Sequence, residues 1–432
     1  MLIWDSNHNY MALSRIWAAF ILISIIVATA RYAFVPADKE IFSNMVVGKA
    51  GDGGQSADGI IETCTHAVTL ALGLIGIMAL FMGLVSIAEQ AGGMRFLARI
   101  TAPFFSKLFP DLPKGHPAMG HMVMNFSANL LGLDNAATPF ALKAMESLQE
   151  LNPDKTTASN SQIMFLCLHA SGLQLIPVSI IALRAAAKVP DPTDVFIPIV
   201  IATFITTLAS MSIVAVRQKI NLFQPVILGW IGSLSLLIAA LVFYLRTLSA
   251  DGVQSFSRAL SGGIILFIFL VIVGVALYRK INIFDAFVQG AKGGFETAVR
   301  IIPYLVGMLV AISMLRTSGT FGVIIDGLKH FFTAIGTDTR FVDGLPTALI
   351  KPLTSAGARG MLVDTMNTLG KDSFAARLSA ILQGSSESTF YVVAVYYGSV
   401  AIRNTRYSIG AMLLADLVSI VSSIFLCYLF FG

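Results

Sequence analysis

Charge is scarce in this sequence. Lys and Arg number 29 and Asp and Glu number 24, so only 12% of the 432 residues are charged, whereas an ordinary soluble domain carries about 25%. The apolar fraction is 56%. A chain with so little charge cannot cover a water-facing surface, and it has too much apolar length for a single compact core. The composition therefore predicts a polytopic membrane protein and excludes a string of soluble domains.

Cysteine and the common catalytic motifs are also scarce. The three cysteines, Cys64, Cys167 and Cys427, lie far apart, which argues against a disulfide framework or a cysteine metal cluster. The sequence contains no phosphate-binding GxxxxGK[ST] loop, no HExxH and no GxSxG, so no motif supports nucleotide-driven transport or hydrolysis. We therefore expect no enzyme and no cofactor, and the motifs leave a metal undecided.

Basic residues give the chain a net charge of +5 but are spread singly over short loops. A nucleic-acid surface needs a dense basic patch, so we expect no nucleic-acid partner. Loop charges of this kind govern membrane orientation. They occur in nearly every loop, so they leave the orientation open.

Long apolar segments are abundant. A bilayer core needs about 20 apolar residues for each helix. The first segment has no small-residue cleavage site after it, so it is expected to be a retained span. The predicted continuous spans are 17–35, 66–87, 161–183, 195–216, 222–245, 262–278, 298–315, 376–400 and 409–431.

Two further segments have spanning length but are rich in Gly, Pro, Ser, Thr and Asn. They cover 119–145 and 346–366. Interrupted backbone survives at membrane depth only where protein or a water-filled cavity satisfies its polar groups. We therefore predict interrupted or re-entrant helices in both segments.

The two halves of the chain repeat the same order of features. Each half has an apolar span, a glycine (Gly92 and Gly319), a Phe-rich amphipathic stretch, an interrupted segment, a polar motif and a closing span. The polar motifs LCLHASGLQ and AILQGSSES align His169 with Gln383, Ser171 with Ser385, and Gln174 with Ser388. Such ordered self-similarity predicts a duplicated fold.

The duplication predicts a domain organisation and a topology. One repeat covers 1–218 and the other 262–432, and an extra transmembrane helix with its loop at 219–261 joins them. If the interrupted segment is a re-entrant hairpin, an odd number of spans separates equivalent points and the repeats are inverted. If it crosses fully, they are parallel. We favour inversion, the arrangement in which many transporters place the substrate site between repeats.

The first interrupted segment carries a group of uncharged polar side chains. Each would cost free energy in lipid without a partner. They either cap broken helix ends and bond across helix contacts or face a polar solute, and the sequence leaves both open. These candidates are Asn125, Ser127, Asn129, Asn135 and Thr138.

The second interrupted segment is broken by Pro and Gly, which expose backbone groups that can bind an ion or an anionic group. Ser355 is the candidate binding residue there. We expect Lys351, in the same segment, and Lys143 to extend their ammonium groups to a membrane interface.

The motif with the most specific chemistry runs from residue 383 to 389 inside an apolar segment. A carboxylate at membrane depth is costly, and its default interpretation is a functional site. Glu387 is therefore the candidate for proton or cation coupling, the alternative being a carboxylate satisfied by a partner. His169 and Asp416 are each open to a functional or a packing role. The candidates of the two polar motifs are His169, Ser171, Gln174, Gln383, Ser385, Ser386, Glu387, Ser388 and Thr389.

Several motifs resemble a known family. NFSANLLGLDNAATPFALKAMESL (125–148) resembles spore maturation protein A, and the sequences at 290–319, 349–365 and 383–407 resemble spore maturation protein B. The chain looks like an A–B fusion, A-like over about 1–218 and B-like over about 264–432. Both are similar to the nucleoside-recognition or Gate domain group, and through it to parts of the ferrous-iron transporter FeoB and of concentrative nucleoside transporters. Asp134 stands where the family pattern has Gly, and Ser386 where Thr is common.

The resemblance implies an all-α membrane fold built from two Gate-type repeats, whose Gate segments are about 116–148 and about 346–366. Our leading hypothesis is a multi-pass transporter of the bacterial cytoplasmic (inner) membrane that moves a small polar solute or ion between the repeats with ion or proton coupling. A homodimer is an expectation at the level of the family. The alternatives are a non-transporting scaffold or assembly factor, a channel, and, more remotely, an intramembrane enzyme that uses His169 and Glu387.

Overall fold

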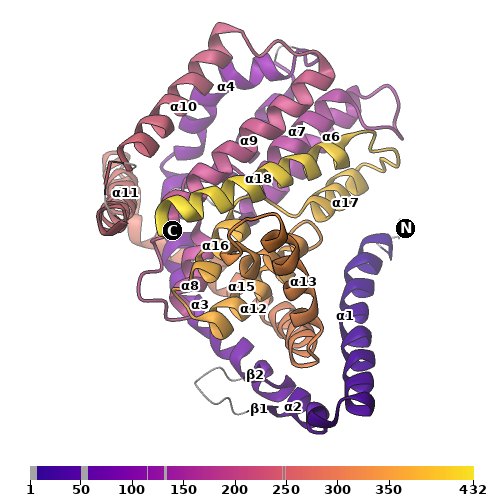
Figure 1. Cartoon of the computed structure of the whole chain (residues 1–432). Helices are drawn as coiled ribbons and strands as arrows, with labels where there is room; N and C mark the ends of the chain where they lie inside the picture. Colours follow the sequence, from indigo (N-terminus) through magenta and orange to yellow (C-terminus); the bar gives the residue numbers. More distant parts are fainter. Residues whose placement is uncertain (1–6, 50–56, 114, 131–133, 246, 249) are drawn as a thin grey trace. The chain divides into compact units, whose positions relative to one another are not determined.

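The computed structural model describes residues 7–49, 57–113, 115–130, 134–245, 247–248 and 250–432. Over these ranges it is almost entirely helical, which confirms the all-α prediction (Figure 1). Two short strands, β1 (Gly48–Lys49) and β2 (Ala57–Asp58), pair antiparallel. The helices are α1 (Asn7–Phe34), η1 (Pro36–Asp38), α2 (Ile41–Val46), α3 (Ile60–Gln90), α4 (Gly93–Leu108), α5 (Pro117–Leu130), α6 (Asp134–Leu151), α7 (Asn160–Ser171), α8 (Val178–Ala186), α9 (Phe196–Gln218), α10 (Pro225–Leu245), α11 (Ala250–Tyr278), α12 (Ile283–Thr317), α13 (Thr320–Ala334), η2 (Arg340–Gly344), α14 (Leu345–Ile350), α15 (Ser355–Leu369), α16 (Phe374–Gly384), α17 (Thr389–Ser399) and α18 (Ser408–Phe431).

Among the described residues, six helices are long and apolar enough to cross a membrane, or up to seven if one bent pair is counted as a single span. They lie in α1, α3, α9, α10, α11 and α18, and the bent pair is formed by α12 and α13. These helices confirm that the chain is a polytopic membrane protein.

The chain divides into two compact units. The first consists of Met1–Ile77, Ala182–Pro192 and Phe295–Gln383, and the second of Met78–Ile181, Thr193–Gly294 and Gly384–Gly432. In the second unit α9 packs alongside α18, as Figure 1 shows. Its main core joins buried side chains of α4 to α7, α9, α17 and α18, among them Met145, Met164 and Tyr396.

The two glycines of the repeat occupy equivalent places. Gly92 precedes α4 with φ +83°, and Gly319 precedes α13 with φ +81°. Glycine adopts such positive φ values without the steric penalty of a side chain. Each repeat thus changes direction at a left-handed glycine before its amphipathic helix, and the axes of α12 and α13 diverge by 68°.

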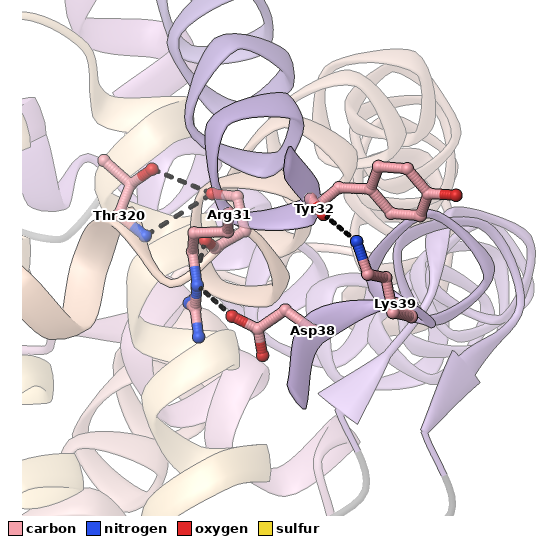
Figure 2. Close-up of polar contacts among 6 residues, drawn as sticks. Arg31, Tyr32, Asp38, Lys39 and Thr320 are labelled. Atoms are coloured by element: carbon pink, nitrogen blue, oxygen red, sulfur yellow. Dashed lines mark hydrogen bonds and ion pairs between the residues drawn. The ribbon is translucent and has the colours of Figure 1, made fainter. Parts of the chain in front are cut away.

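The second of these turns is held by α1. Figure 2 shows the Arg31 guanidinium between Asp38 and the end of α12. Its Nε donates to Asp38 Oδ2 over 2.7 Å, and its Nη1 donates to the Ser318 carbonyl over 3.1 Å. The Ser318 and Thr320 hydroxyls lie 2.8 Å apart across Gly319. An ion pair and a helix-end carbonyl therefore fix this turn.

Two predicted continuous spans are wrong. The segment 161–183 is divided into α7 and α8, and the segment 376–400 into α16 and α17. Helix α7 ends at Ser171 and is capped by Gly172, whose φ is +59°. Helix α17 begins after Ser388, which has an extended backbone. Average hydropathy over 20 residues does not detect a short polar break, and this is why both segments are predicted as single helices.

Both interrupted segments contain paired helices. In the first, His121 Nδ1 lies 3.0 Å from Ser147 Oγ, and Asn125 Nδ2 donates to the Ala137 carbonyl over 2.8 Å. A residue later in α5 thus contacts a residue earlier in α6, which is the pattern of an antiparallel hairpin of the two helices. Helices α14 and α15 also pack on each other. The span count is odd when the interrupted segment is a hairpin and the divided segment 161–183 still crosses the membrane. Inversion of the repeats therefore stays a prediction.

Candidate functional site at the paired helix breaks

The breaks in the two polar motifs meet each other in the second unit. One break covers residues 172–177, between α7 and α8, and the other covers 385–388, between α16 and α17. The Glu387 backbone N–H donates to the Ala170 carbonyl over 2.8 Å. An added Cβ on Gly172 would lie 3.7 Å from the Glu387 nitrogen. Segments that the repeat aligns in sequence are therefore joined in space.

The first hairpin reaches the same place. The Leu175 N–H, in the first break, donates to the Leu130 carbonyl at the end of α5 over 2.8 Å. The last carbonyls of a helix have no partner within the helix, and here a broken helix supplies one. The hairpin and both breaks therefore form one connected polar region.

His169 is the centre of a buried network. Its Nδ1 lies 3.1 Å from Asn125 Oδ1 and 3.0 Å from Asn129 Nδ2. The ring meets Tyr396 edge-on, with centroids 4.8 Å apart and an interplanar angle of 87°. Asn125 is only 1% exposed and also donates to Ala137. Two predicted candidates from the hairpin and one from the polar motif thus contact one another.

Each break is braced by the closing span of its own repeat. The Ser171 hydroxyl donates to Thr207 Oγ1 on α9 over 3.0 Å, and the Ser419 hydroxyl on α18 donates to Ser385 Oγ over 2.7 Å. Ser171 and Ser385 are the residues that the sequence repeat aligns. In both copies the aligned serine bonds to a hydroxyl of the closing span, as donor in the first and as acceptor in the second, which supports the alignment.

A second contact joins α17 to α18. The Thr389 hydroxyl, at the first residue of α17, donates to Asp416 Oδ2 over 2.6 Å. Asp416 is buried, at 7% exposure. Its carboxylate thus holds the start of the helix that follows the second break.

The other predicted candidates are distributed as follows. Ser127 donates to the Val123 carbonyl in its own helix, which satisfies it locally. Ser386 and Ser388 are buried, whereas Thr138, Gln174 and Glu387 are partly exposed. The side chain of Asn135 lies outside the described part of the structure. Ser355 and Gln383 belong to the first unit.

The prediction for Lys351 is wrong. This side chain is 6% exposed, and its ammonium donates to the Gln383 carbonyl rather than reaching an interface. The helix-end carbonyl supplies a polar partner inside the protein, so the side chain has no need to extend. Lys143, in contrast, is exposed on α6.

Three residues of the region are not predicted by the motifs. Thr207 and Ser419 brace the breaks, and Tyr396 packs on His169. The repeat could have indicated Thr207 and Ser419, because both lie on closing spans that follow aligned serines. Tyr396 looks like any aromatic residue of an apolar helix, and no sequence signal distinguishes it.

The chemistry of this region is that of neutral hydrogen bonding. Amides, hydroxyls and one imidazole predominate, with Glu387 and Asp416 as the carboxylates. Among the described residues, no group of three or more His, Cys, Asp or Glu is arranged to hold a metal ion. Such a set can bind a small polar molecule by directional hydrogen bonds.

Comparisons with known proteins agree with the repeat. The model of the nucleoside recognition family, Gate, matches residues 71–187 and 298–403. Spore maturation protein A of Bacillus subtilis (strain 168) is 41% identical over 156 residues, which are 36% of this chain and 80% of that protein. Spore maturation protein B of the same organism is 44% identical over 166 residues, 38% of this chain and 92% of that protein. A crystal structure of the YdaH transporter of Alcanivorax borkumensis aligns with 96% of this chain and 97% of its own, at 14% identity and a TM-score of 0.44.

Proposed function

The chain belongs to the nucleoside recognition (Gate) family, and from that premise we propose that it is a membrane transporter for a small polar solute. The proposed site is the region where the breaks at 172–177 and 385–388 meet. The proposed location is the cytoplasmic membrane of a bacterium.

One observation carries the proposal, namely the hydrogen bond from the Glu387 N–H to the Ala170 carbonyl. Interrupted helices leave backbone groups unsatisfied at membrane depth and persist only beside protein or a polar cavity. Transporters use such breaks to present backbone and side-chain groups to a solute. Two breaks joined to each other, with a helical hairpin at the same place, support that use here.

Specific residues have distinct roles in this proposal. Asn129 and His169 hold the shape of the site, since both are buried in the hydrogen-bonded network. Gln174 and Glu387 are partly exposed within the breaks, so they are suited to meet the solute. We assign Glu387 the coupling role, because a carboxylate can change its charge or bind a cation during a transport cycle.

The test is ligand-dependent stability of the purified protein in detergent. The panel contains nucleosides, which the family description suggests, together with amino acids, dicarboxylates and inorganic ions. A ligand that binds only the folded state at 100 times its Kd adds about 2.7 kcal/mol to the free energy of unfolding. We expect one selective stabilising class, reduced in Glu387→Gln and retained in Glu150→Gln, which alters an exposed carboxylate on α6.

A positive class is then tested for flux into liposomes. Wild-type protein should carry the solute, and Glu387→Gln should lose the dependence of flux on pH or ions. Unchanged coupling in Glu387→Gln would remove this residue from the mechanism.

A second function is favoured by the burial of the network. Asn125 is 1% exposed, its amide nitrogen donates to the Ala137 carbonyl and its amide oxygen lies 3.1 Å from His169 Nδ1, as expected for a purely structural residue. The chain would then be a membrane scaffold or assembly factor, and the names of the two spore maturation relatives agree with such a role. No stabilisation by any panel member, and no flux, would favour this function.

A further inference from the structure

Helices α14 and α16 lie side by side in the first unit. The Thr347 and Ser379 hydroxyls are 2.5 Å apart, and the Lys351 ammonium donates to the Gln383 carbonyl. The two residues of each pair are 32 apart in sequence. From the first pair to the second, the chain moves forward by about one helical turn on both helices. The two helices therefore run parallel, and Lys351 reaches the C-terminal end of α16.

The C-terminal end of α16 offers hydrogen-bond acceptors. The last four carbonyls of a helix have no intrahelical donor, and they carry partial negative charge. Helix α16 stops at Gly384 and the next helix starts at Thr389, so the Gln383 carbonyl is one of these groups. The Gln383 side-chain oxygen is also buried, with no hydrogen-bond partner in the described part of the structure.

Broken helices in transporters present such carbonyls to Na⁺ or to protons. At α16 the positive charge comes instead from the chain itself. Lys351 is 6% exposed, and its ammonium group, which has three donors, bonds to the Gln383 carbonyl. The backbone turns directly after Lys351, where the Thr354 N–H donates to the Ile350 carbonyl over 3.1 Å, and Thr354 Oγ1 accepts from the Gly357 N–H at the start of α15.

The other repeat has no charge at the matching position. Aligning LLGLDNA (130–136) with IKPLTSA (350–356) places Leu131 opposite Lys351, and Leu131 lies outside the described residues. The matching end of α7 receives a backbone donor, because the Ala170 carbonyl accepts from Glu387. The lysine is therefore a feature of one repeat only.

We propose that Lys351 is a tethered cation, whose ammonium takes the place of a monovalent cation at the C-terminal end of broken helix α16. Removing the side chain leaves an acceptor-lined space that binds a small monovalent cation from solution. One corollary rests on the proposed transport function, namely that solute movement does not require Na⁺ or K⁺ at this position.

The test is thermal unfolding of Lys351→Ala in detergent against chloride salts of ammonium, methylammonium, Na⁺, K⁺ and choline at constant ionic strength. The matched control is Lys143→Ala, because Lys143 is exposed on α6. We expect Lys351→Ala to lose stability and to regain most of it, saturably, with at least one small cation but not with choline. Lys143→Ala should resemble the wild type in every salt.

Two outcomes overturn the proposal. One is a Lys351→Ala protein as stable as the wild type, and the other is a salt response indistinguishable from that of Lys143→Ala. The readout is stability rather than flux, so failure of the transport hypothesis leaves this test unaffected, and failure here leaves the solute panel unaffected.

Two further variants separate charge from hydrogen bonding and cover the case in which Lys351→Ala does not fold. Lys351→Gln retains a donor but no charge, and Lys351→Arg retains both. The proposal expects a stable Lys351→Arg and an unstable Lys351→Gln. A Lys351→Gln protein as stable as the wild type would show that the carbonyl needs a donor and not a cation, and would overturn the proposal.

Discussion

His169 has two hydrogen-bond partners at a single ring nitrogen, Nδ1. A nitrogen of a neutral imidazole either donates or accepts a hydrogen bond, depending on the tautomer. With a proton on Nδ1 the ring donates to Asn125 Oδ1 at 3.1 Å, and without it the ring accepts from Asn129 Nδ2 at 3.0 Å. The presence or absence of a proton on Nδ1 therefore decides whether His169 is hydrogen-bonded to Asn125 or to Asn129. Neither asparagine side chain has to move for this change.

The first prediction concerns Asn125→Ala. The substitution removes the donor to the Ala137 carbonyl and one partner of His169. A buried polar group left without a partner costs about 1–3 kcal/mol, and we expect a loss of that size in the free energy of unfolding, measured by denaturation in detergent. Asn367→Ala, at an exposed position of α15, should change little. Equal effects in the two variants would contradict the network.

A second prediction concerns Thr389 and Asp416, whose oxygens are 2.6 Å apart. This distance is typical of a hydroxyl that donates to an ionised carboxylate. We expect Thr389→Val and Asp416→Asn each to destabilise the protein, and the double variant to lose less than the sum. A coupling energy of about 0.5–3 kcal/mol from the double-mutant cycle would measure the contact. Additive losses would show that the two residues act independently.

Residue types in the sequence predict part of this network and miss the rest. Asn125, Asn129 and His169 are identified because amide and imidazole groups are costly in an apolar segment. Lys351 is predicted wrongly, since a lysine near a helix end ordinarily extends to the interface and its carbonyl partner lies 32 residues away in the chain. Burial by a distant segment cannot be inferred from the local pattern.

At the scale of elements, the two left-handed glycines differ in what surrounds them. An added Cβ at Gly319 would lie 1.7 Å from Arg31 Nη1, whereas one at Gly92 would meet nothing within 4 Å. Among the described residues, α1 contacts the repeated turn at Gly319, and no atom comes as close at Gly92. Nothing in the glycine motif itself predicts this asymmetry.

The third prediction uses this matched pair. Gly92→Ala and Gly319→Ala both force a side chain into the left-handed region, at a cost of about 1–2 kcal/mol. Gly319→Ala should cost more, because Arg31 must leave the Ser318 carbonyl and Asp38 (Figure 2). Thermal unfolding of both variants in an Arg31→Ala background should remove the difference. A difference that survives without Arg31 would have another origin.

Elements are predicted well where the signal is apolar length and poorly where it is a break. The spans in α9, α10 and α18 follow directly from hydropathy. The hairpin of α5 and α6 is indicated by its Gly, Asn and Pro content. The breaks after α7 and α16 need only a few polar residues, and the surrounding apolar sequence hides them.

At the scale of the whole molecule, the compact units are not the sequence repeats. Each unit takes segments from both repeats, for example Phe295–Gln383 in the first unit and Gly384–Gly432 in the second. The bond between Glu387 and Ala170 shows the consequence, since one unit contains the breaks of both copies. If the two repeats were expressed as separate chains, the residues of the candidate site would be divided between them.

The last prediction tests whether the repeats are inverted. The loop between α6 and α7 corresponds to the turn between α15 and α16, so Lys155 and Leu369, both exposed, mark equivalent points. The experiment requires a protein in which the native cysteines, Cys64, Cys167 and Cys427, are replaced so that they do not react. Either Lys155→Cys or Leu369→Cys is then introduced as the labelling position. A membrane-impermeant maleimide should label one from outside intact cells and the other only from the cytoplasmic side of inverted vesicles, because an odd number of spans separates inverted copies.

A further pair of variants controls this experiment. Asp154→Cys lies in the same exposed loop as Lys155 and should label from the same side, which shows that the substitution does not alter topology. Labelling of Lys155→Cys and Leu369→Cys from one side would make the repeats parallel. An even number of spans would then separate Lys155 from Leu369, and a substrate site between inverted repeats would be contradicted.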